Sequence, residues 1–331
     1  MSALVYAYRG SLVENLHRLS AAITDPEGKL LAYAGDPDRV AFLRSSAKPF
    51  QALALFTSGA AEKFQITQEQ LALVVASHEG SQRHVAVAQE LLGKIGLGPE
   101  YLACGVHPPG SREARRELAA SGAEPSVLHN NCSGKHSGML AVALALGADP
   151  KGYELPEHPV QQLNFQAIRD LAGVSAVPYA IDGCSVPTFA LPLTKAARMF
   201  ALLAAPQAAP EKYRLGLEQA FQAMRAYPEL VAGEGSIDTV LMRKAAGLAA
   251  KRGADGYYGM ALCESRWGPL GITLKVEDGS QTAREPAVVR LLELLGALSP
   301  DEPLEWRRPA IKNHRGLEAG HLQADIRLTW L

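Results

Sequence analysis

The stretch NLHRLSAAITDPEGKLLAYA, residues 15–34, predicts the kind of sheet on which the fold is built. Its first half mixes β-branched and apolar residues, and Asp25-Pro26-Glu27-Gly28 is a strong turn sequence. Residues 29–34 are apolar again and can pair back on the first half. We therefore expect an antiparallel hairpin near the start of the chain, with a short strand over 3–8 before it.

Helical spacing of apolar residues follows this hairpin, and strand character returns mainly near the C-terminus. Helices are expected over 48–61, 67–77, 83–95, 112–120, 136–146, 159–171, 193–203, 211–224 and 284–298. Strands are expected over 177–181, 256–263 and 271–277, with weak strand character over 310–331. This order predicts an α+β fold with one antiparallel sheet assembled from both ends of the chain.

Composition excludes several classes of protein. The 331 residues are 47% hydrophobic, enough for one elaborate domain or two. A net charge of −1 without a long Lys/Arg run indicates no nucleic-acid partner. No apolar run reaches the roughly 18 residues of a membrane span, and no secretory signal opens the chain. The four cysteines are therefore expected to be reduced thiols in a cytoplasmic protein.

Ser45 and Lys48 form an S-x-x-K pair in the segment Arg44 to Gln51. Positions three apart share one face of a helix, so the two side chains could touch there. Burial or a neighbouring cation would favour a neutral Lys48, which could deprotonate the serine. The alternative is an ordinary helix start, with a serine as the cap and Lys48 facing solvent.

A second serine and a late lysine complete the pattern. Ser77 begins Ser77-His78-Glu79-Gly80, which could equally be the C-terminal cap of a helix. Lys251 begins a K-x-G element typical of serine acyl-transfer enzymes, and its alternative is an exposed helix end. Each signal is weak alone, but the three in this order favour Ser-Lys chemistry.

The polar sequence His129 to His136 opens an otherwise apolar predicted helix. Cys132 and Cys184 could both be thiolate ligands of zinc. His136 would be an ordinary third ligand, whereas Lys135 would bind only as a neutral amine, more weakly as pH drops. The alternative is that both cysteines are small buried hydrophobic residues.

Asp182 follows a predicted strand. Its carboxylate could bind a substrate amino group or orient Lys135, or Asp182 could simply be a turn residue before Gly183. The segment 233–238 is weakly similar to a phosphate-binding loop but lacks the lysine and the preceding strand of that motif. Phosphate binding is not expected.

Together these motifs resemble the rhizobial-type, class 3 L-asparaginases of the asparaginase II family, over about residues 14–322. The stretch Asn130 to His136 is the most specific part of the resemblance. It implies a serine β-lactamase/DD-peptidase-like fold, an antiparallel sheet flanked by helices with a largely helical second region. It also implies a single domain over 1–331 and a homodimer.

The resemblance further implies two Ser-Lys pairs, Ser45 with Lys48 and Ser77 with Lys251. Lys275 is the competing choice for the last position, and the K-x-G context favours Lys251.

The resemblance also implies a Zn²⁺ site that assists substrate binding more than hydrolysis. Its ligands would be Cys132, Lys135 and Cys184, with water completing the shell. The substrate pocket would be lined by Arg44, His136 and Asp182.

The expected activity is hydrolysis of L-asparagine to L-aspartate and ammonia by acyl transfer, with Ser45 as the first choice for nucleophile and Ser77 as the alternative. One methylene changes binding by only about 1–3 kcal/mol, so the sequence does not separate asparagine from glutamine. Three other functions are considered. They are a zinc-water amidohydrolase acting on another small amide, a serine β-lactamase or glutaminase-like hydrolase, and a zinc-dependent binding protein without activity.

Overall fold

The computed structural model describes residues 3–331, and its contacts divide the chain into two compact units. The first unit contains the residues up to Ser46, Ala190–Ala205 and Lys244–Leu331. The second contains Ala47–Phe189 and Pro206–Arg243. This division does not test the prediction of one domain over 1–331, which stays a prediction.

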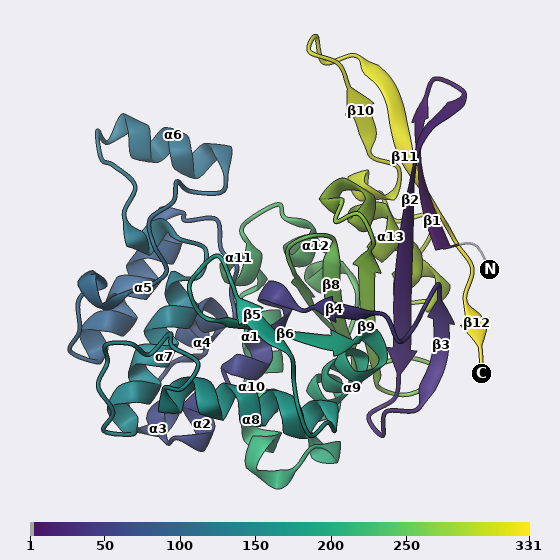
Figure 1. Cartoon of the computed structure of the whole chain (residues 1–331). Coiled ribbons are helices and arrows are strands. Elements are labelled where there is room, and N and C mark those ends of the chain that lie inside the picture. The colour runs from purple at the N-terminus through teal and green to yellow at the C-terminus, as the bar shows by residue number, and fades with distance from the viewer. Residues whose placement is uncertain (1–2) are drawn as a thin grey trace. The chain divides into compact units, whose positions relative to one another are not determined.

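An antiparallel sheet forms the centre of the first unit (Figure 1). Its strands run in the order β10, β11, β1, β2, β9, β8 and β7, while β3 pairs with β2 and β12 with β3. The bounds are β1 Ala3–Arg9, β2 Leu12–Thr24, β3 Leu30–Ala34, β7 Leu248–Arg252, β8 Tyr257–Leu262, β9 Leu270–Val276, β10 Ala310–Lys312, β11 Glu318–Ile326 and β12 Thr329–Trp330. The short strand β4 (Val40–Phe42) also belongs to this unit, and its Phe42 lies opposite Ala190.

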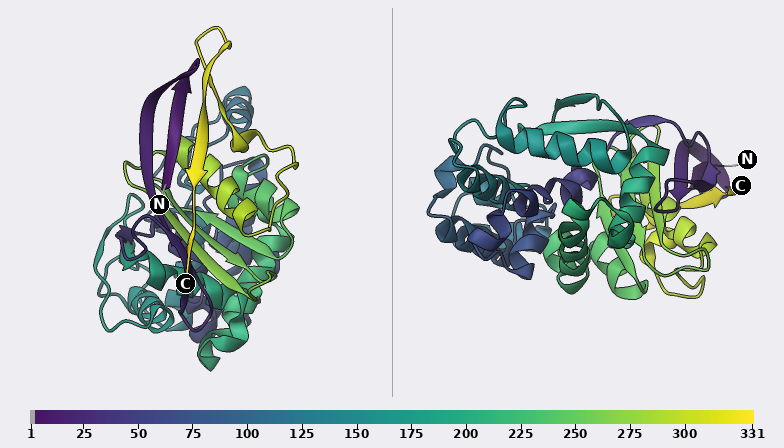
Figure 2. Two further views of the ribbon diagram at one scale, coloured as in Figure 1. Left: turned by 90° about the vertical axis from the view of Figure 1, so that its right-hand side faces the viewer. Right: turned by 90° about the horizontal axis from the view of Figure 1, so that it is seen from below.

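The expected hairpin and the expected use of both chain ends are confirmed. In β2 and β3, Ile23 lies opposite Ala32, and the turn between the strands is closed by the Lys29 amide, which donates to the Asp25 side chain at 2.8 Å. Strand β1 pairs with β11, with Ala3 opposite Ile326. Figure 2 shows these first and last strands side by side.

Two helices cover opposite faces of this sheet. A Cβ atom added at Gly271 would lie 1.8 Å from the carbonyl oxygen of Ala197, so α9 (Leu193–Ala204) lies directly against that face. On the other face, the Arg284 guanidinium of α13 (Gln281–Leu294) lies 5.6 Å from the centre of the Tyr258 ring. The class is therefore α+β, with an antiparallel sheet between helices.

The second unit is mostly helical. Its helices are α1 Lys48–Gln51, α2 Ala54–Thr57, α3 Ala60–Lys63, α4 Gln68–Val74, α5 Gln82–Lys94, α6 Arg112–Ala120, α7 Ser133–Ala145, α8 Pro159–Ala172, α10 Glu211–Ala226, α11 Pro228–Ala232 and α12 Ile237–Lys244. A short strand, β5 (Tyr179–Ile181), pairs with the beginning of β6 (Pro187–Pro192). No helix in the part of the chain that the structure describes is both long and apolar enough to cross a membrane.

One predicted helix was wrong, and one alternative that the sequence left open is excluded. The single helix expected over 48–61 is three short helices, and Gly59, at φ +74°, separates the second from the third. Lys251 lies within strand β7, so the alternative of an exposed helix end is excluded. Its side chain is fully buried.

Candidate active site

Close packing of α7 on α4 creates the site. A Cβ atom at Gly134 would lie 2.2 Å from the carbonyl oxygen of Leu73, and one at Gly138 would lie 2.8 Å from Val74 Cγ1. The two glycines are four residues apart and therefore share one face of α7, which can approach the backbone of α4. As a result, Ser77, three residues after the end of α4, lies beside the beginning of α7.

The Lys48 amine contacts three oxygen atoms in the segments that follow α4 and precede α7. Its Nζ donates to Ser77 Oγ at 3.0 Å, to the carbonyl oxygen of Ala76 at 2.5 Å and to that of Asn131 at 3.3 Å. The side chain is 1% exposed. The alternative of a solvent-facing Lys48 is therefore excluded.

The surroundings of Lys48 favour its neutral form. Burial lowers the pKa of Lys48, and the Lys135 cation lowers it further, against the opposing effect of the Cys132 and Cys184 thiols. A neutral amine has two N–H bonds and one lone pair. The protonated amine donates to all three oxygen atoms; in the neutral amine the two N–H groups can stay on the backbone carbonyls while the lone pair accepts the hydroxyl hydrogen of Ser77.

The backbone amides around Ser77 already have acceptors. The Ser77 amide donates to the carbonyl oxygen of Val231 at 2.9 Å, and the His78 amide donates to that of Asn131 at 3.3 Å. The Gly80 amide donates to His78 Nδ1 at 3.1 Å, so His78 Nε2 carries the hydrogen that Ser133 Oγ accepts. An oxyanion formed near Ser77 would have to find donors other than these three amides.

Three buried side chains lie near Lys48: the thiols of Cys132 and Cys184 and the amine of Lys135. Lys135 Nζ donates to Cys184 Sγ at 3.0 Å. A hydrogen bond from the Cys184 thiol holds the pKa of Cys132 well below its usual range and raises the pKa of Cys184. Burial lowers the pKa of Lys135, but the Cys184 and Cys132 thiols outweigh that effect and the pKa is raised.

These donors fit zinc. Across residues 3–331, no group of three or more His, Cys, Asp and Glu side chains is placed to hold a metal ion, so His136 does not complete a set with the two cysteines. A metal here needs the amine of Lys135 as its third protein ligand. Two sulfur atoms and one nitrogen with an open fourth position suit Zn²⁺.

His136 and Asp182 occupy different environments. His136 is fully buried, and its Nδ1 lies 2.5 Å from the hydroxyl oxygen of Tyr153. Burial lowers the pKa of His136 to about 4. Asp182 accepts from the Gly183 amide at 2.8 Å in the turn that leads to Cys184, and it raises the pKa of Lys135. Asp182 is therefore a turn residue, and its binding of a substrate amino group or orientation of Lys135 stays a prediction.

The remaining candidates lie in the first unit. Arg44, with φ at +51°, forms an ion pair with Asp255, and Lys275 Nζ donates to the carbonyl oxygen of Asp255. Lys251 Nζ donates to the carbonyl oxygen of Arg252 at 3.2 Å.

Ser45 also belongs to this unit. The pairs Ser45 with Lys48 and Ser77 with Lys251 each combine residues from the two units, and both stay predictions.

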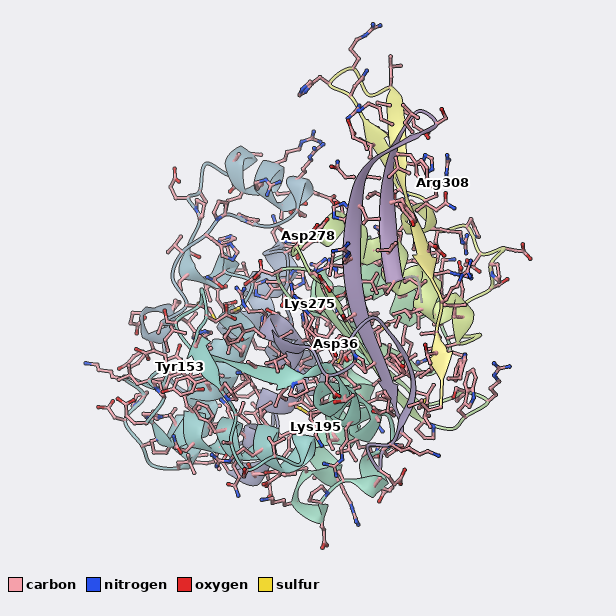
Figure 3. All side chains as sticks on the ribbon, turned by 45° about the vertical axis from the view of Figure 1, so that its right-hand side comes forward. Asp36, Tyr153, Lys195, Lys275, Asp278 and Arg308 are labelled. Atoms are coloured by element: carbon pink, nitrogen blue, oxygen red, sulfur yellow. The ribbon has the colours of Figure 1, made fainter. Side chains whose placement is uncertain are left out.

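Sequence reasoning did not identify Tyr153, which is labelled in Figure 3, or the carbonyl oxygens of Ala76 and Asn131 as parts of the site. No motif marks Tyr153, which precedes α8 in an irregular segment. Backbone carbonyls carry no sequence signal at all. Only the packing of α4, α7 and the loops after them brings these groups together.

Comparison with known proteins gives one family match. The family model of L-asparaginase II matches residues 5–324. No curated protein sequence matches the chain.

Three solved structures are similar to this chain. Mglu in its tris and glutamate form is 15% identical over 87% of this chain and 61% of its own, with a TM-score of 0.46. A Bacillus glutaminase is 14% identical over 84% of this chain and 91% of its own, at 0.40. A β-lactamase from Sphaerobacter thermophilus is 14% identical over 86% and 94%, at 0.44.

Proposed function

The chain belongs to the L-asparaginase II family, which makes it a hydrolase of amides, and on that premise we propose that it converts L-asparagine to L-aspartate and ammonia. The observation that carries this proposal is the buried contact between Lys48 Nζ and Ser77 Oγ, beside which the amine also contacts two carbonyl oxygens. A serine is a poor nucleophile unless a base takes its proton, and a neutral buried lysine is such a base.

In the proposed reaction, Ser45 Oγ attacks the carbon of the side-chain amide. The Lys48 amine, paired with Ser77, takes up the proton and later returns it to the leaving nitrogen, which departs as ammonia. Water then attacks the aspartyl ester, and L-aspartate leaves with Ser45 restored. Ser77 is assigned to proton transfer rather than attack because its own amide, a common oxyanion donor, is bound to Val231.

Zn²⁺ is proposed at Cys132, Lys135 and Cys184. When bound, it would supply a positive charge that attracts and orients polar groups of the substrate. Both thiols must be deprotonated and Lys135 neutral to hold it.

Arg44 is proposed to bind the substrate α-carboxylate and Asp182 its amino group, with His136 lining the pocket. A homodimer and a cytoplasmic location are also proposed, on the resemblance alone. Light scattering of the purified protein tests the first of these.

The test is ammonia release from L-asparagine, with L-glutamine in parallel, by the wild type and three serine variants. We expect Ser45→Ala to abolish turnover and Ser77→Ala to lower it by about 100- to 10,000-fold. Ser137→Ala is the matched control, because that buried hydroxyl donates only to the carbonyl oxygen of Ser133 within α7.

Full turnover in both Ser45→Ala and Ser77→Ala would contradict acyl transfer and favour attack by metal-bound water. A larger loss in Ser77→Ala would reverse the two serine roles. No ammonia from either amide would overturn the proposed substrate.

A further inference from the structure

The hydroxyl of Tyr153 links the backbone to His136. The side chain is 1% exposed, and its oxygen accepts a hydrogen bond from the Ala103 amide at 2.9 Å. The same oxygen lies 2.5 Å from His136 Nδ1. The phenol and imidazole rings meet edge to face, with centres 5.5 Å apart. The position of His136 is therefore set by a residue far from it in the sequence.

The number of hydrogens that Tyr153 and His136 carry decides which of them donates the hydrogen bond between them. A phenol has one hydrogen to donate. If His136 Nδ1–H were the donor, the Tyr153 oxygen would accept two N–H groups, and its own hydrogen would be buried with no acceptor. A buried donor without a partner costs about 1–3 kcal/mol. The Tyr153 hydroxyl therefore donates to Nδ1, and the ring of His136 carries its hydrogen on Nε2.

The Nε2 atom of His136 is the unusual feature. It is buried and makes no hydrogen bond of ordinary geometry with the protein among residues 3–331. Unpaired buried polar atoms are rare and call for an explanation. The thiol of Cys184 lies beside the ring, close enough for the two side chains to shift each other's pKa. A sulfur that holds a metal ion accepts an N–H better than a thiol does, so Cys184 would be the partner of this N–H in the metal-bound protein.

We propose that Tyr153 is a positioning residue that fixes His136 as the Nε2–H tautomer, so that His136 supplies a hydrogen bond to the sulfur of Cys184 when that sulfur binds a metal ion. The chain of contacts runs from the Ala103 amide through Tyr153 and His136 to Cys184. This inference rests on the proposed Cys132–Lys135–Cys184 site. Groups that support a metal ligand in this way typically contribute about 10- to 100-fold to metal affinity.

The first experiment records long-range proton–nitrogen correlations of the histidine rings in ¹⁵N-labelled, metal-free protein, with His136 assigned from the spectrum of His136→Gln. We expect the wild type to show the Nε2–H tautomer of His136. In Tyr153→Phe, which removes only the hydroxyl, we expect a mixture of tautomers or the Nδ1–H form. Tyr213→Phe is the matched control, because that buried hydroxyl donates to Asp170 Oδ2 at 2.8 Å, outside the chain of contacts.

The second experiment measures Zn²⁺ affinity by competition with a chromophoric chelator. We expect Tyr153→Phe to bind Zn²⁺ about 10- to 100-fold more weakly than the wild type, and Tyr213→Phe to bind as the wild type does. A wild type that fails to bind Zn²⁺ would overturn the metal site, while the spectrum would still test the tautomer.

An Nδ1–H tautomer of His136 in the wild type would overturn the role of Tyr153. Unchanged tautomer and unchanged zinc affinity in Tyr153→Phe would overturn it as well.

Discussion

Two buried lysines of the helical unit, Lys48 and Lys135, differ in the state of their amines. Both are almost fully buried, at 1% and 4% exposure. Lys48 contacts two carbonyl oxygens and a hydroxyl as well as the Cys132 thiol, and its pKa is lowered. Lys135 contacts the thiol of Cys184, and its pKa is raised. Burial alone therefore does not decide the charge of a lysine; the groups that face it do. A lowered pKa suits Lys48 to proton transfer, whereas Lys135 has to lose its proton before its amine can bind a metal ion.

The largest expected effects come from removing each amine in turn. Lys48→Met should lower kcat by about 100- to 10,000-fold while Zn²⁺ remains bound, because a positioned base is lost. Lys135→Met should release Zn²⁺ and raise KM with less effect on kcat. Steady-state kinetics together with metal analysis separate the two variants.

Lys63→Met on α3 is the control for both, since its Nζ donates only to the carbonyl oxygen of Leu144. The distinction between the two lysines fails if Lys48→Met keeps normal kcat, or if Lys135→Met retains the metal at wild-type affinity.

A smaller difference between the two lysines is expected in pH dependence, that of kcat for Lys48 and that of Zn²⁺ affinity for Lys135. A base must be neutral, so a lowered pKa leaves Lys48 active down to lower pH, and kcat falls as pH drops through that pKa. Because burial lowers the pKa of Lys48, kcat should level off below pH 10.5, the ordinary pKa of lysine. Zn²⁺ affinity should continue to increase at higher pH, because the raised pKa of Lys135 retains its proton longer.

The measurements are kcat at saturating substrate and Zn²⁺, and the Zn²⁺ dissociation constant with proton release, both across pH. A kcat that increases only near pH 10.5 would mean that the pKa of the Lys48 amine is not lowered in the protein.

The smallest expected effect concerns the packing that brings both lysines together. Gly134→Ala would place a methyl group 2.2 Å from the carbonyl oxygen of Leu73, which should destabilise the protein by about 1–3 kcal/mol. Gly93→Ala in α5 is the matched control: nothing lies within 4 Å of its added Cβ atom, and better helix propensity should add about 0.5–1 kcal/mol. Chemical denaturation of both variants gives the comparison. Equal stability of Gly134→Ala and the wild type would show that α7 can move away from α4 without cost.

The sequence predicted the parts of this protein that depend on local pattern. The hairpin through Asp25, the strands at both ends of the chain and most helices follow from periodicity and turn residues. The convergence of Cys132, Lys135 and Cys184 was foreseen as an implication of the resemblance, and the structure brings these three side chains together.

What the sequence did not predict depends on packing between distant segments. The contact of Lys48 with Ser77 was not expected, because S-x-x-K spacing directs attention to the serine on the same helix turn. Tyr153 was not predicted either, since its role depends on where the loop before α8 meets α7. A hydrogen-bond partner supplied by a carbonyl oxygen, such as that of Ala76, depends on tertiary contacts that no residue type reveals.

The pairing of β1 with β11 has a consequence for how the protein folds during synthesis. Ala3 cannot meet Ile326 until more than 300 further residues have been made. At about 5–20 residues per second, the outer edge of β1 waits roughly 15–60 s for its partner. An unpaired strand edge invites association with other chains. Newly made chains should therefore be most prone to aggregation before the last strands leave the ribosome, and a chain truncated ahead of β11 should keep that exposed edge permanently.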